Sequence, residues 1–340
     1  MVSPRQQQVG RLDAPGRIRI DTADIPEAGP GDVIVKVGMT GICGTDLAFY
    51  REGLPVAGVV LGHEFAGEIV AAGCEVAGIA LGDRIVANPM IDFVGLGAIP
   101  GAFSEYLRIP QAEPGRNIFV LPDSVSTENG ALVEPFAVAL HALNRGRARP
   151  GERAVIYGAG PIGLCVLAAL NARGVEGVLV VEPSARRRAM ALEMGAAAVH
   201  DPRGGDSAAF VATHVGADDT PYAESPLGRA DIAFDCAGVA PALGAAAASL
   251  RARGRLVIVA DPHENVLAPL RLVMLRELEV IGACTYEDEF PEAIALLSSG
   301  KADLSGIVSH RLPLARLDEA FAIQMDAEQA LKVLVVPGST

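Results

Sequence analysis

The chain is poor in basic residues. Its 340 residues contain 28 lysines and arginines against 41 aspartates and glutamates, which gives a formal net charge of −13. A partner with a phosphate backbone needs a basic surface, and no long run of Lys or Arg supplies one locally. We therefore expect no nucleic acid partner.

Long apolar runs are also missing. Residues 1–11 are polar and lack the apolar stretch of a signal peptide, and no later segment is long and uncharged enough to span a bilayer. The sequence thus predicts a cytoplasmic protein with no membrane partner.

Cysteine is scarce, and its distribution excludes a disulfide framework. The five cysteines are an odd number, lie far apart and form no C-x-x-C pair, so at least one is expected to bind a metal or to react. Cys165 and Cys236 fall in apolar segments, and Cys74 and Cys284 lack neighbours of metal-binding type, so we interpret these four as structural. Cys43 remains as the candidate.

Half of the chain is apolar, enough for two hydrophobic cores, and two domains are expected. The first part is predicted to be β-rich, because short apolar strands at 32–37, 65–70 and 83–87 are each bounded by Gly or Pro. The tail, with helices predicted at 290–298 and 317–325, is expected to return to this first domain.

From about Arg153 onward, strands and helices alternate. Strands are predicted at 154–157, 178–181, 231–235, 255–259 and 279–283. Helices are predicted at 162–172, at 185–194 and in the Ala-rich stretch that ends at 250, with a further helix inside a surface connection at 201–228. This alternation is typical of an α/β fold with a doubly wound parallel sheet.

A glycine-rich turn joins the first of these strands to its helix. Its sequence is Gly158-Ala159-Gly160-Pro161-Ile162-Gly163, and the strand before it and the helix after it make it a dinucleotide-binding fingerprint. Gly158 permits the tight turn, Gly160 lets the backbone approach a pyrophosphate, and Gly163 allows close helix packing. The alternative is a turn of the same shape that binds nothing.

Glu182 ends the second strand, about 20 residues beyond the turn, where a carboxylate accepts hydrogen bonds from the adenosine ribose and repels a 2′-phosphate. This favours NAD over NADP. Arg186, Arg187 and Arg188 complicate the choice, since an arginine turned toward the ribose could accept a phosphate. We expect all three to face solvent and keep Arg187 as a candidate for cofactor contact.

Metal-ligand chemistry occurs in three separated segments of the β-rich part, which contain Cys43, His63 with Glu64, and Glu134. Thiolate, imidazole and carboxylate are the ligands that zinc prefers, and a catalytic zinc uses three of them. Binding both glutamates would make the site net negative and close it, so one glutamate is expected to lie outside the first shell or to exchange with water. Asp46 is the candidate to orient the His63 ring.

The sequence resembles the zinc-containing medium-chain dehydrogenase/reductase family, in the branch of sorbitol-like polyol and threonine dehydrogenases. The resemblance spans nearly the whole chain and is carried by segments 41–46 (GICGTD), 61–67 (LGHEFAG), 81–85, 101–106, 134–135 and 158–163. It implies a GroES-like catalytic domain at 1–140 and 284–340, a Rossmann domain at 141–283, and an active site in the cleft between them.

The resemblance also implies roles for single residues. Cys43, His63, Glu64 and Glu134 match the family's zinc ligands, and Thr45 matches the hydroxyl that relays the substrate proton. It further implies a homodimer or a homotetramer.

Three departures from the family pattern limit what is carried over. The segment 89–101 is short and has no cysteine where relatives hold a second zinc, so no structural zinc is expected. Ala48 stands where many relatives have a histidine that relays protons, and Thr285 stands where sorbitol-like relatives have an arginine. The last difference puts a polyol substrate in doubt.

These observations together predict a zinc-dependent, NAD-linked dehydrogenase that transfers hydride between the cofactor and a secondary alcohol or the matching ketone. Sugars, cyclitols and simple secondary alcohols all remain as candidate substrates. Two alternatives stay open: a zinc-free enone or quinone reductase, and a non-catalytic NAD(P)-binding protein. His141 is interpreted as a packing residue outside the mechanism.

Overall fold

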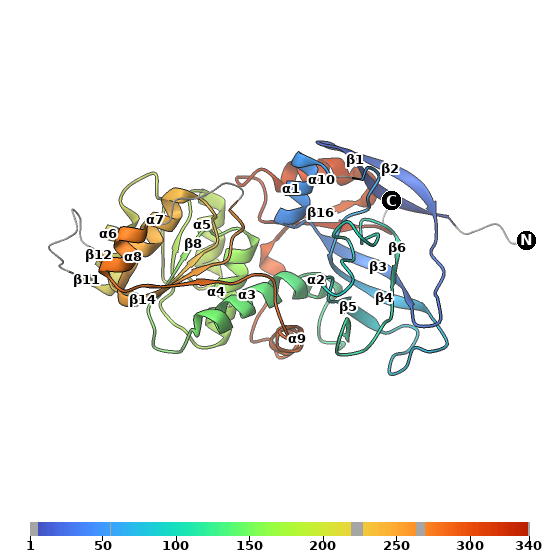
Figure 1. Cartoon of the computed structure of the whole chain (residues 1–340), viewed down its shortest axis with the longest axis horizontal. Coiled ribbons are helices and arrows are strands. Elements are labelled where there is room, and N and C mark those ends of the chain that lie inside the picture. Colours follow the sequence, from blue (N-terminus) through green and yellow to red (C-terminus); the bar gives the residue numbers. More distant parts are fainter. Residues whose placement is uncertain (1–5, 55, 219–226, 263–268, 339–340) are drawn as a thin grey trace, which may run out of the picture. The chain divides into compact units, whose positions relative to one another are not determined.

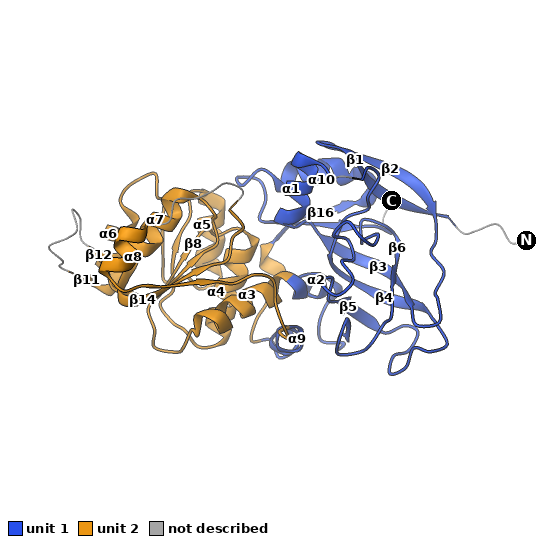
Figure 2. Cartoon of the chain, viewed as in Figure 1, with its two compact units in different colours: residues 1–134, 290–300, 308–340 blue, residues 135–289, 301–307 orange. Residues whose placement is uncertain are grey.

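The computed structural model describes residues 6–54, 56–218, 227–262 and 269–338. The chain forms two compact units, shown in different colours in Figure 2: unit 1 comprises residues 1–134, 290–300 and 308–340, and unit 2 comprises residues 135–289 and 301–307. Elements are labelled in Figure 1.

Unit 1 is built on a largely antiparallel sheet, as the short predicted strands require. Across the sheet its strands are β16 (Val308–Pro313), β17 (Lys332–Val336), β3 (Val33–Gly41), β4 (Glu64–Ala72), β5 (Arg84–Ala87) and β7 (Ile118–Val120), with β6 (Tyr106–Ile109) also paired to β3. A separate hairpin joins β1 (Gln6–Ala14) to β2 (Arg17–Asp24). The strand β17, from the end of the chain, thus lies directly beside β3.

Among the described residues, four α-helices accompany this sheet, and a fifth begins in unit 1 and continues into unit 2. They are α1 (Gly44–Glu52), α2 (Thr127–Ala131), α9 (Phe290–Ser298), α10 (Leu317–Gln324) and the continuing helix α3 (Val133–Gly146). One core cluster of unit 1 packs Phe103 against Phe321, with ring centroids 5.6 Å apart. Residues 290–300 and 308–340 thus belong to the same compact unit as the first part of the chain.

Unit 2 contains a six-stranded sheet in which every pairing is parallel. Its order is β10 (Ala198–His200), β9 (Leu179–Val181), β8 (Ala154–Tyr157), β13 (Ala230–Asp235), β14 (Leu250–Ile258) and β15 (Glu279–Gly282). When the strands of this sheet alone are numbered along the chain, that order is 3-2-1-4-5-6, the arrangement of dinucleotide-binding folds. The predicted doubly wound sheet is confirmed.

Helices connect these strands, and the sheet lies between helical layers (Figure 1). They are α4 (Pro161–Ala172), α5 (Ala185–Glu193), α6 (Ser207–Val215), α7 (Ala240–Ser249) and α8 (Leu270–Leu275). The helix expected within 201–228 is α6, and it is followed by a short ladder of β11 (Ala217–Asp218) with β12 (Leu227–Gly228). Residues 219–226 of that predicted connection lie outside the described residues.

Within the described part of the chain, no helix combines the length and the apolar character needed to cross a bilayer.

Candidate active site

Cys43 and Glu64 are brought together by the pairing of two strands. β3 ends at Gly41 and β4 begins at Glu64, and these two residues are partners in the antiparallel register. Cys43 follows as the N-cap residue of α1, and His63 directly precedes β4. The sheet therefore gathers side chains from segments that are well separated in sequence.

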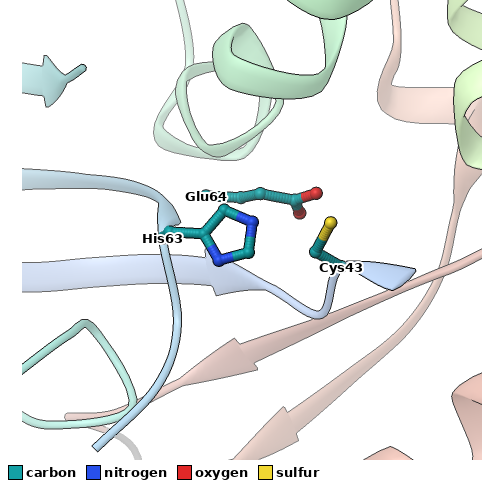
Figure 3. A group of neighbouring side chains, drawn as sticks. All are labelled: Cys43, His63 and Glu64. Atoms are coloured by element: carbon teal, nitrogen blue, oxygen red, sulfur yellow. The ribbon is translucent and has the colours of Figure 1, made fainter. Parts of the chain in front are cut away.

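The three side chains form a compact group (Figure 3). One ligand atom each of Cys43, His63 and Glu64 lies within 4.8 Å of the other two. His63 is 4% exposed and Glu64 is 1% exposed. A thiol, an imidazole and a carboxylate enclosed in this way are a donor set suited to zinc, with a fourth position left for another ligand.

Asp46 supports this group from the first turn of α1. It is fully buried, and its Oδ2 atom accepts a hydrogen bond from the backbone N–H of Cys43 at 2.9 Å. Its Oδ1 atom lies 3.5 Å from Nδ1 of His63, which is longer than a well-formed hydrogen bond. The expected hydrogen bond between the two side chains therefore stays a prediction, and Nε2 of His63 is the nitrogen left for a metal.

The charges around His63 control its protonation. Burial is the largest single influence on the pKa of His63 and would lower it, but the contributions of Asp46 and Cys43 together outweigh burial, and the pKa is raised well above its ordinary value. Because a protonated imidazole cannot bind a metal, a metal ion held by His63 would displace a proton and would bind more weakly as the pH falls.

Lys332, at the start of β17, is a site residue that sequence analysis missed. Its side chain is 1% exposed, its Nζ atom forms an ion pair with Oε2 of Glu64, and it donates a hydrogen bond to the carbonyl of Ile42 at 2.9 Å. The available signal was a single lysine in the apolar run 331–336, because a charged residue inside a buried strand needs a partner.

The other residues predicted for the metal site lie less centrally. Glu134 occupies the first turn of α3, is half-buried and does not belong to the compact group of three. Thr45 is exposed in the first turn of α1. The roles of Glu134 as a ligand and of Thr45 as a proton relay stay predictions.

The glycine turn of unit 2 has the geometry expected of a phosphate-binding loop. Gly158 follows β8 with a φ of +95°, a conformation that favours glycine. A Cβ atom on Gly163 would lie 1.9 Å from the carbonyl oxygen of Gly158, so only glycine permits this close approach. Gly160 caps α4, and Pro161 begins it, followed by Ile162. The N–H groups of this helix terminus offer a site for an anion.

Glu182 ties this loop to the second strand. It is 3% exposed, and its two carboxylate oxygens accept hydrogen bonds from the backbone N–H groups of Ala159 at 2.7 Å and Ser184 at 2.8 Å. Each oxygen retains a second lone pair for a further donor. Contact between Glu182 and a ribose stays a prediction.

The three neighbouring arginines do not all face solvent as expected. Arg186 is exposed, whereas Arg187 and Arg188 are half-buried. Arg188 donates to the carbonyls of Glu182 and Pro183, and Arg187 has Nη1 3.7 Å from the position that a Cβ of Gly160 would take. The expectation is therefore wrong for Arg187 and Arg188, and Arg187 lies beside the glycine turn.

His141 is satisfied structurally. Its Nδ1 atom lies 2.9 Å from Oε1 of buried Glu289, which also accepts a hydrogen bond from Asn144 at 2.9 Å. Its interpretation as a packing residue agrees with these contacts.

The short segment 89–101 packs against the histidine loop. Cβ atoms on Gly95 and Gly101 would lie 2.1 and 2.4 Å from the carbonyl oxygen of Gly62, the residue before His63. A backbone bridge between Val94 and Ile99 closes the segment. Direct backbone packing thus holds this loop beside the metal-ligand group.

Comparison with known proteins agrees with this geometry. The family described as "Alcohol dehydrogenase GroES-like domain" matches residues 29–122, and the family described as "Zinc-binding dehydrogenase" matches residues 161–299. Among curated proteins, the chain is 34% identical to (R,R)-butanediol dehydrogenase of Bacillus subtilis, over 94% of this chain and 96% of that protein. It is 31% identical to sorbitol dehydrogenase of the same organism, over 98% of each chain.

A solved structure extends the likeness to the fold. The crystal structure of 2R,3R-butanediol dehydrogenase from Bacillus subtilis aligns with a TM-score of 0.87 at 32% identity, covering 98% of this chain and 100% of that chain. With both family matches and relatives of full length, the chain belongs to the zinc-type medium-chain alcohol dehydrogenase family, polyol branch, and is an oxidoreductase of that family.

Proposed function

We propose that the protein is an NAD-linked, zinc-dependent dehydrogenase that interconverts a small secondary alcohol and its ketone. The observation that carries this proposal is the compact group of half-buried Cys43 with buried His63 and Glu64, which combines three preferred zinc ligands within 4.8 Å. The names of the relatives, butanediol and sorbitol dehydrogenases, favour a substrate with neighbouring hydroxyl groups. As part of this proposal, 1–140 and 284–340 form the catalytic domain and 141–283 the dinucleotide-binding domain.

Cys43 and His63 would hold the zinc ion together with Glu64 or Glu134, and the other glutamate would lie outside the first shell or exchange with water. A zinc ion at such a site supplies Lewis acidity, which lowers the pKa of an alcohol into the range where it can lose its proton. Asp46 orients the Cys43 loop through its hydrogen bond to the Cys43 backbone. The exposed hydroxyl of Thr45 accepts the proton and passes it to water.

The glycine turn would hold the dinucleotide, whose nicotinamide ring accepts the hydride. The N-terminus of α4 would hold the pyrophosphate through its backbone N–H groups, and Gly160 would leave room for it. Glu182 would accept hydrogen bonds from the ribose hydroxyls and exclude a 2′-phosphate. Arg187, beside Gly160, adds a positive charge toward the phosphates.

The remaining parts of the proposal concern assembly, location and metal count. A cytoplasmic homodimer or homotetramer with no structural zinc is proposed. The assembly is supported by β15, an edge strand of the unit 2 sheet with Val280 47% exposed. Light scattering on the purified chain measures the assembly state.

The decisive experiment combines metal analysis with turnover. Purified protein is assayed for zinc content and for NADH formation with (R,R)-butanediol, sorbitol and simple secondary alcohols, before and after chelation and after zinc is restored. We expect about one zinc per chain and turnover that chelation abolishes and zinc restores.

Other outcomes of this experiment have distinct meanings. About two zinc ions per chain would contradict the assignment of a single catalytic metal. Full activity without metal would favour the zinc-free reductase, and NADH binding without turnover on any substrate would favour a non-catalytic protein.

A further inference from the structure

The buried ammonium of Lys332 contacts both segments that contribute metal ligands. It forms an ion pair with Oε2 of Glu64, a member of the ligand group, and donates to the carbonyl of Ile42, the residue before Cys43. The pair is enclosed, since the side chains of Lys332 and Glu64 are each 1% exposed. One cation from the end of the chain therefore links the two ligand segments.

The backbone is arranged to admit this pair. β17 lies antiparallel to β3 with Leu334 opposite Gly41, and the N–H of Ile42 donates to the carbonyl of Val333 at 3.2 Å. A Cβ atom on Gly41 would lie 2.2 Å from Oε2 of Glu64 and 2.8 Å from Cε of Lys332. The absence of a side chain at Gly41 thus provides the space that the Glu64–Lys332 pair occupies.

The cost of burying this lysine argues for a role beyond packing. An ammonium removed from water loses favourable solvation, and apolar residues of similar volume often replace buried ion pairs without loss of stability. The following residues of β17 are valine and leucine, which already supply apolar packing. The positive charge of Lys332 is instead suited to hold and neutralise the carboxylate of Glu64, which it contacts.

We propose that Lys332 is a positioning residue that holds Glu64 in place and limits the strength with which Glu64 binds the metal. The ammonium and a zinc ion compete for the negative charge of the same carboxylate, whose Oε2 atom already contacts Nζ. Lys332 thereby keeps Glu64 a weak, exchangeable ligand and leaves a coordination position open for substrate. This inference rests on the proposed zinc-dependent function.

Replacing Lys332 by Met tests the proposal, because methionine keeps an unbranched apolar stem and removes the charge. We expect zinc affinity to rise by about tenfold, which is a typical size for the change in metal affinity when a group that contacts a metal ligand is substituted. The affinity is measured by competition with a chromogenic chelator on the full-length protein. Because Glu64 then occupies the open position, we also expect kcat to fall more than KM rises.

The direction of the change separates this role from a purely structural one. Loss of a packing residue would weaken zinc binding or leave it unchanged, whereas loss of a competitor strengthens it. In a Glu64→Gln background, Lys332→Met should leave zinc affinity within about twofold, because the charge on which Lys332 acts is gone. Lys332→Arg keeps the positive charge and should keep affinity near that of the wild type.

Further variants guard against a folding defect. Lys332→Gln removes the charge but keeps a donor for the Ile42 carbonyl, and it should also raise zinc affinity. Arg311→Met serves as the matched control, because Arg311 lies on the neighbouring strand β16 and forms a more exposed ion pair with Glu128 of α2. Breaking this pair should leave zinc affinity unchanged.

Two results would overturn the inference, and they are distinguishable. If the wild type binds zinc and folded Lys332→Met or Lys332→Gln protein binds it equally or more weakly, the role of Lys332 is wrong while the proposed function stands. If the wild type binds no zinc, the proposed function and this inference fail together.

Discussion

The metal-ligand group of unit 1 and the glycine turn of unit 2 are built in opposite ways. The turn is six consecutive residues, 158–163, and acts through backbone N–H groups and the absence of side chains. The metal-ligand group is made of side chains from the N-cap of α1, the residue before β4 and the first residue of β4, with Lys332 added from β17. A local pattern therefore specifies the first site, whereas strand pairing specifies the second.

The two sites also differ in how they handle charge. The carboxylate of Glu182 is buried beside the turn and is satisfied by two neutral N–H groups. The carboxylate of Glu64 is equally buried but is matched by a full positive charge on Lys332. The cofactor loop is thus complete without a counter-ion, while the metal-ligand group balances formal charges and depends on each of them.

The largest expected effect is the loss of one metal ligand. Cys43→Ser should lower turnover by about a thousandfold or more, since Lewis-acid stabilisation is worth several kcal/mol. Zinc content should fall below stoichiometric, while dinucleotide affinity and the circular dichroism spectrum stay unchanged. Metal analysis and steady-state kinetics measure these effects.

Cys74→Ser is the matched control for this substitution, because Cys74 is an exposed cysteine of the same unit and should tolerate the change. Wild-type turnover by Cys43→Ser protein would remove Cys43 from the mechanism.

A substitution that distorts the glycine turn should lower dinucleotide affinity and leave zinc content unchanged, the reverse of the effect of Cys43→Ser. Gly163→Ala places a Cβ atom 1.9 Å from the carbonyl oxygen of Gly158, so the turn or the start of α4 must shift. We expect dinucleotide affinity to fall by at least about tenfold and stability to fall by about 1–3 kcal/mol, with zinc content unchanged. Titration with NADH, followed by fluorescence, measures the affinity.

Gly244→Ala on α7 serves as the control, because a Cβ atom there meets nothing within 4 Å and should be neutral or slightly stabilising. Equal effects of the two substitutions would show that the close approach at Gly163 is unimportant.

Glu182 links the turn to cofactor choice, and its removal should have an intermediate effect. Glu182→Ala removes the acceptor for Ala159 and Ser184, so NADH affinity should fall by about tenfold, the range for a lost hydrogen bond to a charged group. NADPH affinity should fall less, because the repulsion of a 2′-phosphate is also removed.

Affinities for NADH and NADPH are compared side by side, with Glu182→Gln as the variant that keeps one oxygen acceptor. An equal loss for both cofactors would mean that Glu182 acts only by holding the turn.

What the sequence predicted follows the same division between local and long-range structure. The predicted segments 154–157 and 290–298 coincide with β8 and α9, because apolar periodicity and flanking glycine or helix-forming residues are local signals. β14 begins at Leu250 and not at Arg255, because the polar stretch 251–254 concealed its first half. The parallel order of the unit 2 sheet followed from the alternation of strands and helices.

The metal site was predicted only in part. Cys43, His63 and Glu64 were recognised by residue type and family resemblance, and the register of β3 with β4 brings them together. Lys332 was missed because its partner lies far away in sequence and is set by the pairing of β17 with β3. The environment of Arg187 and Arg188 likewise depends on the loop after β9, which no sequence pattern specifies.

A third buried carboxylate, that of Asp231 in unit 2, can be compared with those of Glu64 and Glu182. Its replacement is expected to have the smallest effect of the substitutions considered. It accepts hydrogen bonds from Nε of Arg153 at 2.8 Å and from Nε of Arg251 at 2.6 Å, and both arginines are well exposed to water. Burial by itself would raise the pKa of Asp231, but the hydrogen bonds from Arg153 and Arg251 outweigh it and hold the pKa well below its usual range.

Replacing Asp231 by Asn should therefore lower stability in a pH-dependent way. Because the pKa of Asp231 is depressed in the folded state, its ionised form stabilises the fold above the unfolded pKa of about 4, and this stabilisation is lost as the pH falls below that value. We expect a loss of about 1–2 kcal/mol at pH 7, since exposed partners are screened by water. Calorimetric melting of both proteins between acidic and neutral pH measures the difference, and a difference that does not shrink toward acidic pH would contradict an ionic role.

Glu64→Gln in metal-free protein should lower the free energy of unfolding more than Asp231→Asn does, because it leaves the ammonium of Lys332 buried without its anion.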